Sequence, residues 1–166
     1  MRMIASIVMV FMLVGVLPVG GSGELPDAVP TYKYSPDQQS VIKKYGNPYH
    51  FTILLMQQQR FRYESWFYFT PYKKQFGFVN GKKTLEKPLT FGMSAKDKVV
   101  GVTPNQFTFT TTQANVRTLF GTPTKTITGA TGTNTVAWSY VPKGVTVTFA
   151  NNKISGVATV PPAKKK

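Results

Sequence analysis

SPDQQSVIKKYGNP, residues 35–48, has a second version later in the chain, TTTQANVRTLFGTP at residues 110–123. Two further segments follow each version in the same order. They are ESWFYFTP (64–71) and FGFVNGK (76–82) after the first, and VAWSYVP (136–142) and VTFANNK (147–153) after the second. Gly46 and Gly121 are 75 residues apart, and Trp66 and Trp138 are 72 residues apart. An internal repeat of this length indicates two units of similar architecture.

Each unit is expected to open with a short helix. Ser35 can cap the first turn, and Pro36 suits the first helical position. Gly46 can adopt the left-handed conformation that ends a helix, and Pro48 prevents the helix from resuming. The second unit repeats this start and stop, so we expect a helix over about 36–45 and another from Thr111 or Thr112 to Phe120, followed by Gly121 and Pro123.

After each helix the sequence changes to the alternating pattern of antiparallel strands. The predicted strands are 51–56, 63–69 and 75–79 in the first unit, and 124–128, 135–141, 145–150 and 154–160 in the second. Asn80-Gly81 and Asn151-Asn152 suit tight hairpin turns. The predicted fold class is α+β, with two tandem repeats of a helix and a three-stranded antiparallel meander. One sheet shared by both repeats and two separate lobes are both left open.

The domain boundaries follow from the repeats and from composition. Residues 1–23 have the pattern of a signal peptide, and an uncleaved N-terminal anchor is the alternative. Residues 24–34 are expected to be a linker, 35–88 the first repeat, 89–109 a connector in which a short helix could begin at Gly92, 110–160 the second repeat, and 161–166 a basic tail. The leader predicts export to a periplasmic, cell-surface or secreted location, with tethering if the leader is retained.

The composition excludes some chemistry and favours anionic partners. The chain has no cysteine, which excludes disulfides, thiolate chemistry and lipid attachment through a lipobox cysteine. Its 20 Lys and Arg against 6 Asp and Glu give a formal charge of +14. Such a charge favours phospholipid headgroups, anionic wall polymers, nucleic acid or an acidic protein surface.

The titratable residues do not form a catalytic or metal-binding pattern. His50 is the single histidine, and the six carboxylates are scattered without the spacing of a calcium or zinc site. Glu64 falls on the same strand face as Trp66, so we expect it to pair with a nearby Arg or Lys. The sequence therefore predicts a protein that is not an enzyme, with no catalytic residue, cofactor, metal or small-molecule substrate.

Strand alternation separates a core face from an outward face. Trp66, Tyr68, Phe76 and Phe78 are expected to face the helix in the first unit, as Val136, Trp138, Tyr140, Val145, Val147 and Phe149 do in the second. This assignment leaves Tyr63, Phe67 and Phe69 pointing outward, with Lys73 and Lys74 beside them. Clustered exposed aromatic residues mark interaction surfaces, so these five residues form the candidate partner-binding site. The alternative is that the connector or the other repeat covers them.

The paired pattern V-x-x-x-[YF]-G-x-P, then W-x-Y, then F-x-N-x-K resembles the SmpA/OmlA superfamily. That superfamily includes the BamE-like barrel-assembly lipoproteins and the tandem-repeat β-lactamase inhibitor proteins. The positions that match its structural signature are Val41, Gly46, Pro48, Trp66, Tyr68, Phe78 and Asn80, and Val116, Gly121, Pro123, Trp138, Tyr140, Phe149 and Asn151. The resemblance implies secretion and protein binding by a sheet face. This chain differs in lacking both the lipid-bearing cysteine and the inhibitors' disulfides.

The expected function is that of a secreted or membrane-tethered bacterial cell-envelope protein. It would bind another envelope or extracellular protein without catalysis, as an assembly factor or an inhibitor does. The alternative is a cationic module that binds anionic lipid, wall polymer or nucleic acid, and its affinity would fall steeply with salt.

Overall fold

The structure is a computed structural model that describes residues 28–90, 98–130 and 133–160. The predicted leader (1–23), residues 24–27 of the linker, the helix considered at Gly92 and the basic tail (161–166) lie outside the described residues. In chain order the elements are α1 (Pro36–Tyr45), β1 (His50–Met56), β2 (Phe61–Tyr68), β3 (Lys74–Val79), β4 (Lys82–Pro88), η2 (Pro104–Gln106), α2 (Gln113–Phe120), β5 (Lys125–Thr128), β6 (Thr135–Tyr140), η3 (Val141–Lys143), β7 (Val145–Ala150) and β8 (Lys153–Thr159).

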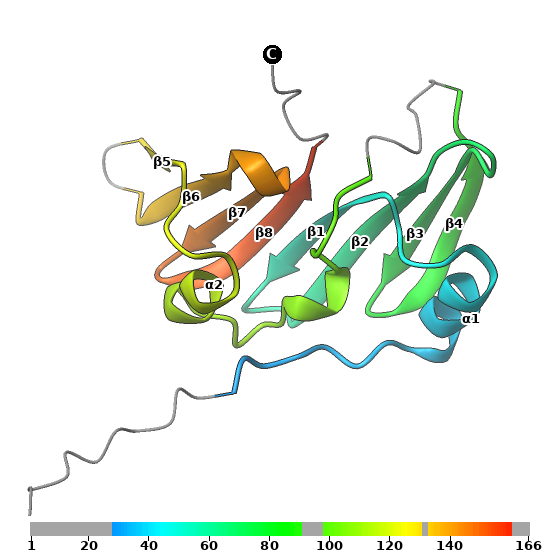
Figure 1. The fold of residues 1–166 in the computed structure, drawn as a ribbon. Helices are drawn as coiled ribbons and strands as arrows, with labels where there is room; N and C mark the ends of the chain where they lie inside the picture. Colours follow the sequence, from blue (N-terminus) through cyan, green and yellow to red (C-terminus); the bar gives the residue numbers. More distant parts are fainter. Residues whose placement is uncertain (1–27, 91–97, 131–132, 161–166) are drawn as a thin grey trace, which may run out of the picture.

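All eight strands form one antiparallel sheet in the order β4-β3-β2-β1-β8-β7-β6-β5 (Figure 1). The prediction of two tandem repeats, each a helix and a three-stranded meander, is therefore wrong. The described chain is mainly this eight-stranded sheet with two short α-helices. β1 and β8 meet at its centre, where Thr52, Ile53 and Leu54 pair with Ala158, Val157 and Gly156.

The difference from the prediction has two physical causes. β4 reads KKTLEKP, and six of its seven residues are exposed, so it lacks the alternating apolar residues by which a strand is recognised. Its hairpin partner β3 nevertheless pairs with it along its full length, with one bulge between Gly77 and Phe78. The second cause is that β1 and β8 would each leave an unpaired edge, and pairing with one another removes both edges.

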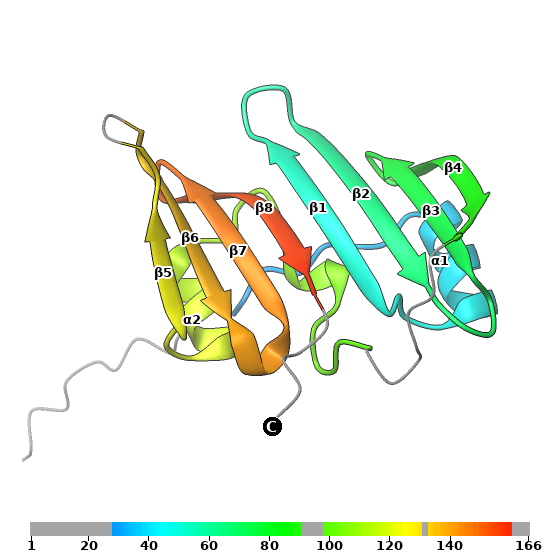
Figure 2. The same cartoon turned by 90° about the horizontal axis from the view of Figure 1, so that it is seen from above.

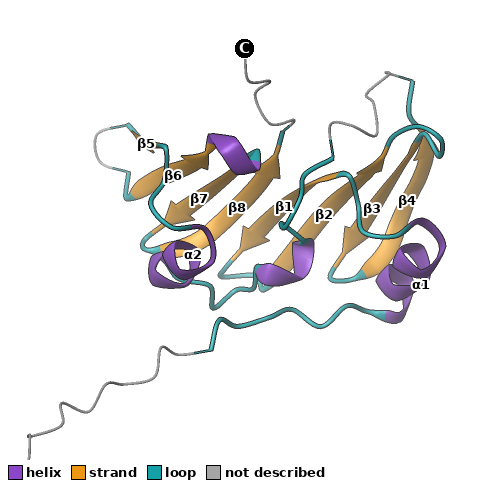
Figure 3. Cartoon of the chain, viewed as in Figure 1, coloured by secondary structure: helices purple, strands orange, loops and turns teal. Residues whose placement is uncertain are grey.

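Both helices begin and end as their sequences predict. Ser35 and Thr112 cap the two N-termini by accepting a backbone hydrogen bond from Gln38 and Asn115, and each cap is part of a reciprocal capping box. Gly46 and Gly121 follow the last turns with φ of 77° and 80°, values that glycine adopts without strain. The helices, with η2 between them, lie against one face of the sheet (Figures 1 and 3).

The core fills the space between this face and the helices. Each half packs a tryptophan against a phenylalanine on the neighbouring strand: Trp66 lies 4.6 Å from Phe78, and Trp138 lies 4.9 Å from Phe149, between ring centroids. Val41 of α1 and Val116 of α2 are buried in the same core. The signature residues Pro48, Tyr68 and Tyr140 are also buried, Pro123 is half-buried, and Asn80 and Asn151 lie in the hairpin turns with positive φ.

A buried ion pair joins three parts of the chain: β2, α1 and the segment around η2. Arg62 Nε lies 2.7 Å from Glu64 Oε1, and the two side chains are 1% and 0% exposed. Glu64 also accepts hydrogen bonds from Gln38 Nε2 (2.7 Å) and Trp66 Nε1 (2.9 Å), while Arg62 donates to the carbonyl oxygens of Pro104 and Phe107. The predicted pairing of Glu64 with a nearby cation is confirmed.

The segment before α1 lies against this ion pair. The Tyr32 ring stacks 4.0 Å from the Arg62 guanidinium, and Tyr32 N donates to Asn105 O. Tyr34 packs edge-on against Trp66 and accepts a hydrogen bond from Asn105 N. Burial raises the pKa of Tyr34 to about 12. Residues 28–34, expected to be part of a linker, thus pack as a strap across the helix-covered side.

Candidate functional site

The face of the sheet opposite the helices is not covered by any described element. In Figure 2 the strands lie in front, and α1 and α2 lie behind them. We call this surface the open face. Strand pairing assigns its residues, because paired residues of antiparallel strands point to the same side. One row of paired residues crosses all eight strands: Ile127, Ala137, Thr148, Gly156, Leu54, Tyr63, Val79 and Lys82.

The half of the open face built by β1 and β2 is apolar. Leu54 and Met56 of β1 are 45% and 44% exposed, which is unusual for large apolar side chains in the centre of a sheet. Phe61, Tyr63 and Phe67 of β2 lie beside them and are half-buried. Leu54 pairs with Tyr63, and Met56 pairs with Phe61, so these four side chains adjoin, and Phe67 lies on the same face of β2 beyond Ser65. We call these five residues the apolar patch.

Tyr63 is held in place by its neighbours on β2 and β3. Ser65 Oγ lies 3.2 Å from Tyr63 Oη, and Gln75 Nε2 donates to Ser65 Oγ at 3.5 Å. Gly77 lies beside this arrangement: a Cβ atom there would be at an ordinary contact distance of 3.7 Å from Tyr63 Oη but only 2.9 Å from Leu85 Cβ. The most polar member of the apolar patch is therefore preorganised, which lowers the entropy cost of binding.

Over β6, β7 and β8 the open face carries mainly small side chains. Its residues there are Thr135, Ala137, Ser139, Thr146, Thr148, Ala150, Gly156 and Ala158, all of them half-buried. None of these side chains extends far above the strands. The open face is thus asymmetric: a partner would meet bulky apolar side chains over β1 and β2 and a low surface of hydroxyls and methyl groups over β6, β7 and β8.

The charges near the open face are positive. Lys82, Lys87 and Lys125 point to this side, because they pair with Val79, Gln75 and Ser139. The three carboxylates of the described residues are all on the helix side. Glu64 is buried, Asp37 accepts from Lys83 N, and Glu86 lies 2.5 Å from Lys74 Nζ and 3.0 Å from Lys83 Nζ.

The Glu86 carboxylate is partly neutralised by its two lysines. Hydrogen bonds from Lys74 and then Lys83 lower the pKa of Glu86 to about 2. The same pairing raises the pKa of Lys74. The acid on β4 is therefore occupied by local cations and does not offset the lysines on the open face.

The structure brings together two of the five residues predicted to bind a partner. Tyr63 and Phe67 lie on the open face as expected. Phe69 is only 2% exposed and packs on His50 and Tyr49, with ring centroids 5.3 and 5.9 Å apart. The expectation that Phe69 is part of an exposed surface is wrong, because this residue follows the end of β2 and is covered by His50 and Tyr49.

The two predicted rim lysines do not border the apolar patch. Lys73 is exposed in the turn before β3, where its φ is 49°. Lys74 points to the helix side with Phe76, and it is engaged by Glu86. Sequence reasoning missed Leu54, Met56 and Phe61. Leu54 and Met56 could have been found by extending the alternation argument to β1, whereas Phe61 precedes the predicted start of its strand.

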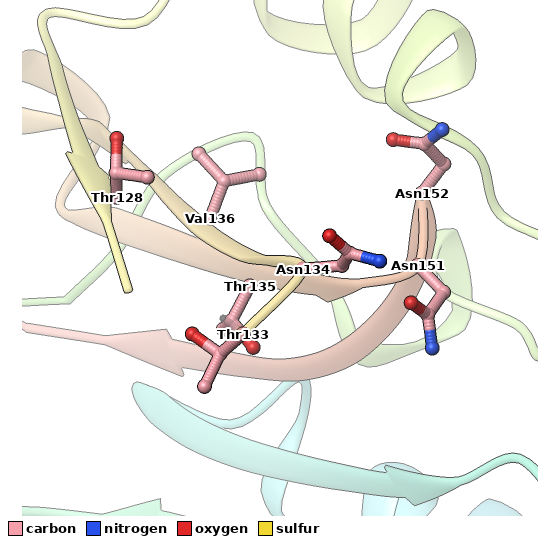
Figure 4. A pocket seen from close by; sticks show the side chains of 7 residues that line it. All are labelled: Thr128, Thr133, Asn134, Thr135, Val136, Asn151 and Asn152. Atoms are coloured by element: carbon pink, nitrogen blue, oxygen red, sulfur yellow. The ribbon is translucent and has the colours of Figure 1, made fainter. Parts of the chain in front are cut away.

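No group of three or more metal-ligating side chains lies together in the described ranges. His50 is buried, and its Nδ1 lies 3.3 Å from Thr159 Oγ1. A hollow of about 410 Å³ lined mainly by amides and hydroxyls lies at the β5–β6 end of the sheet. Figure 4 shows Asn134 between Thr135 and Asn151, with Thr128 and Val136 on the far side. Amides and hydroxyls at these positions supply no acid–base pair.

The fold and the open face define an α+β protein with one side of its sheet available for contact. No family model matches the chain, and neither the curated proteins nor the solved structures contain a match. The resemblance to the SmpA/OmlA superfamily stays a prediction. Across residues 28–90, 98–130 and 133–160, no helix is long and apolar enough to cross a membrane.

Proposed function

We propose that this protein is a non-catalytic binding module that docks another protein on the open face of its sheet. The observation that carries the proposal is the apolar patch of Leu54, Met56, Phe61, Tyr63 and Phe67. Its side chains come from β1 and β2, and no described helix or strand lies over that face of the sheet. Contiguous apolar surface at the centre of a face, with polar groups around it, is the arrangement of a protein interface.

Charge indicates the chemistry of the partner. Lys82, Lys87 and Lys125 stand at the two edges of the open face, and no described carboxylate shares it. A complementary partner would present an apolar centre with Asp or Glu around it, since opposite charges at the rim steer association and reject other surfaces. We take the partner to be an acidic envelope or extracellular protein, because the predicted leader indicates export.

The experiment is a comparison of matched variants of the full chain. Leu54→Ser/Met56→Ser removes the two most exposed members of the apolar patch, whereas Val100→Ser changes an apolar side chain that is 82% exposed outside the sheet. Each protein is immobilised and exposed to envelope extract in low and high salt. A retained protein is then purified and titrated against each variant by calorimetry. We expect one acidic protein that binds the wild type and Val100→Ser at high salt and loses at least about tenfold in affinity for the double variant.

Two results would contradict the proposal. The purified partner could bind the double variant as tightly as the wild type, which would place the interface elsewhere. Alternatively, high salt could release every bound species from the immobilised wild type and from both immobilised variants. Circular dichroism and thermal unfolding of the variants exclude loss of folding as the cause.

A cationic surface on the helix side supports a second candidate function. Lys33, Lys43, Lys44, Arg117 and Lys143 are all exposed there. These cations suit an anionic membrane, wall polymer or nucleic acid. Binding to vesicles containing phosphatidylglycerol, or to single-stranded DNA, should then fall steeply between low and high salt and should be unchanged in Leu54→Ser/Met56→Ser. Binding that is insensitive to salt would reject this second function.

A further inference from the structure

The two edges of the sheet are protected to different degrees. β4 carries Lys82, Lys83 and Lys87, and a bulge interrupts its pairing with β3. Both features discourage a further strand from pairing with that edge. β5 has the sequence KTIT, with all four residues exposed, one lysine and no bulge in its pairing with β6. Ile127 in its centre is 50% exposed.

Among the described residues, no strand pairs with the outer side of β5. Gly129 N donates to Thr135 O across the β5–β6 ladder. Because such bonds alternate along an antiparallel strand, the N–H and C=O groups of Ile127, two residues before Gly129, point to β6. Those of Thr126 and Thr128 therefore point away from the sheet, where another extended strand can satisfy them.

We propose that β5 pairs with β5 of a second copy of this chain in an antiparallel dimer centred on Ile127. In this register Thr126 exchanges backbone hydrogen bonds with the partner's Thr128, and the two Ile127 side chains meet on the open face. Residues paired without backbone hydrogen bonds approach to about 4.5 Å between Cα atoms, so Ile127 would lose most of its exposure. Because the same strand, KTIT, stands on both sides of this interface, a two-fold axis through the two Ile127 residues can relate the copies.

The positions of the lysines also favour this register, because it keeps the two Lys125 side chains apart. Lys125 pairs with the partner's Gly129, so the two copies of Lys125 are about 13 Å apart along the strands. Each chain carries a formal charge of +14, which opposes association over longer distances. Dimerisation should therefore strengthen as salt screens this repulsion, the reverse of the salt dependence of binding to an anionic surface. Because β4 is protected, the assembly stops at two copies instead of continuing as a filament.

The absence of cysteine makes the register directly testable. Ile127→Cys and Lys125→Cys each introduce a single thiol on the same strand and the same face. With oxidised glutathione as the oxidant, Ile127→Cys should form a covalent dimer, since a Cα separation of about 4.5 Å fits a disulfide. Lys125→Cys should not. Equal cross-linking of the two variants would overturn the register.

Sedimentation equilibrium of the unmodified chain tests the dimer itself. We expect a monomer–dimer equilibrium at concentrations up to about 1 mM, because an interface of this size is weak. Ile127→Lys places two like charges opposite each other and should weaken dimerisation by about tenfold or more, with an unchanged circular dichroism spectrum. A wild-type chain that remains monomeric throughout this range at high salt would overturn the proposal.

Discussion

At the scale of single residues, the core contains a buried ion pair, Arg62–Glu64, whose two charges are costly to remove from water. Both side chains are almost fully buried, and their hydrogen bonds reach α1, η2 and Trp66. A buried charge is tolerated only when its partner and its hydrogen bonds are present together. The pair therefore holds the strap and α1 in one arrangement relative to the sheet.

Glu64→Gln tests this role. The substitution keeps the size of the side chain but leaves the Arg62 guanidinium buried without its counter-charge, so we expect a loss of about 3 kcal/mol in unfolding free energy. Urea denaturation measures the loss. Glu86→Gln is the control, because that carboxylate pairs with two lysines at the surface and should cost less than about 1 kcal/mol. Equal losses in the two variants would contradict the structural role of the buried pair.

Two tyrosines at corresponding places in the two halves differ in one hydrogen bond. Tyr68 Oη donates to Gly46 O at 2.8 Å, whereas Tyr140 Oη is buried without a partner among the described residues. Burial raises the pKa of both hydroxyls, because the deprotonated, negatively charged form of each would be poorly solvated in the apolar core.

Removing the two hydroxyls should change the stability of the fold in different directions. Tyr68→Phe leaves the Gly46 carbonyl without its donor and should cost about 1 kcal/mol. Tyr140→Phe removes an unsatisfied polar atom from the core and should be neutral or stabilising. The midpoints of thermal unfolding distinguish the two variants. A destabilised Tyr140→Phe protein would show that the hydroxyl of Tyr140 has a binding partner in solution.

At the scale of elements, the bulged β3–β4 hairpin depends on Gly77. A Cβ atom at this position would stand 2.9 Å from Leu85 Cβ, which is closer than real Cβ contacts. Gly77→Ala should therefore shift β4 and cost about 1 to 3 kcal/mol. Gly156→Ala is a matched control on the same face, because its nearest neighbours would lie at 3.5 and 4.0 Å. Chemical denaturation should show Gly156→Ala at or above wild-type stability, and the reverse order would refute the packing argument.

The elements that could be predicted from sequence are those with strong local signals. Ser35 and Gly46 mark the ends of α1, and the alternation around Trp66 and Trp138 identifies the core face of each half. β4 could not be predicted, since its lysines are exposed on both sides and its pairing is supplied by β3. Phe69 and the strap at Tyr32 and Tyr34 were also missed as core elements, because their burial depends on neighbours that are distant in sequence.

At the scale of the whole molecule, the junction of β1 and β8 joins the two halves. Three residue pairs form it, and the Thr159 side chain extends it: its hydroxyl accepts from Phe51 N at 2.7 Å and donates to Phe51 O at 3.0 Å. These contacts couple strands that are more than 100 residues apart in the chain. We expect the halves to unfold together in one transition.

Thr159→Val tests this coupling. The variant preserves shape but leaves the backbone N–H and C=O of Phe51 without their partner in a buried position, which should cost about 2 to 4 kcal/mol. Scanning calorimetry should show a single transition for the wild type, with equal calorimetric and van't Hoff enthalpies, and a lower or divided transition for the variant. Two separate transitions in the wild type would contradict coupled unfolding.

The central place of β8 also sets the order in which the molecule can be completed during synthesis. β1 is the first strand to leave the ribosome, yet one of its two neighbours in the sheet, β8, ends at residue 159. Until that residue emerges, the nascent chain exposes one side of β1, and unpaired strand edges promote aggregation. A chain that stops after β7 would leave this side of β1 without its partner strand.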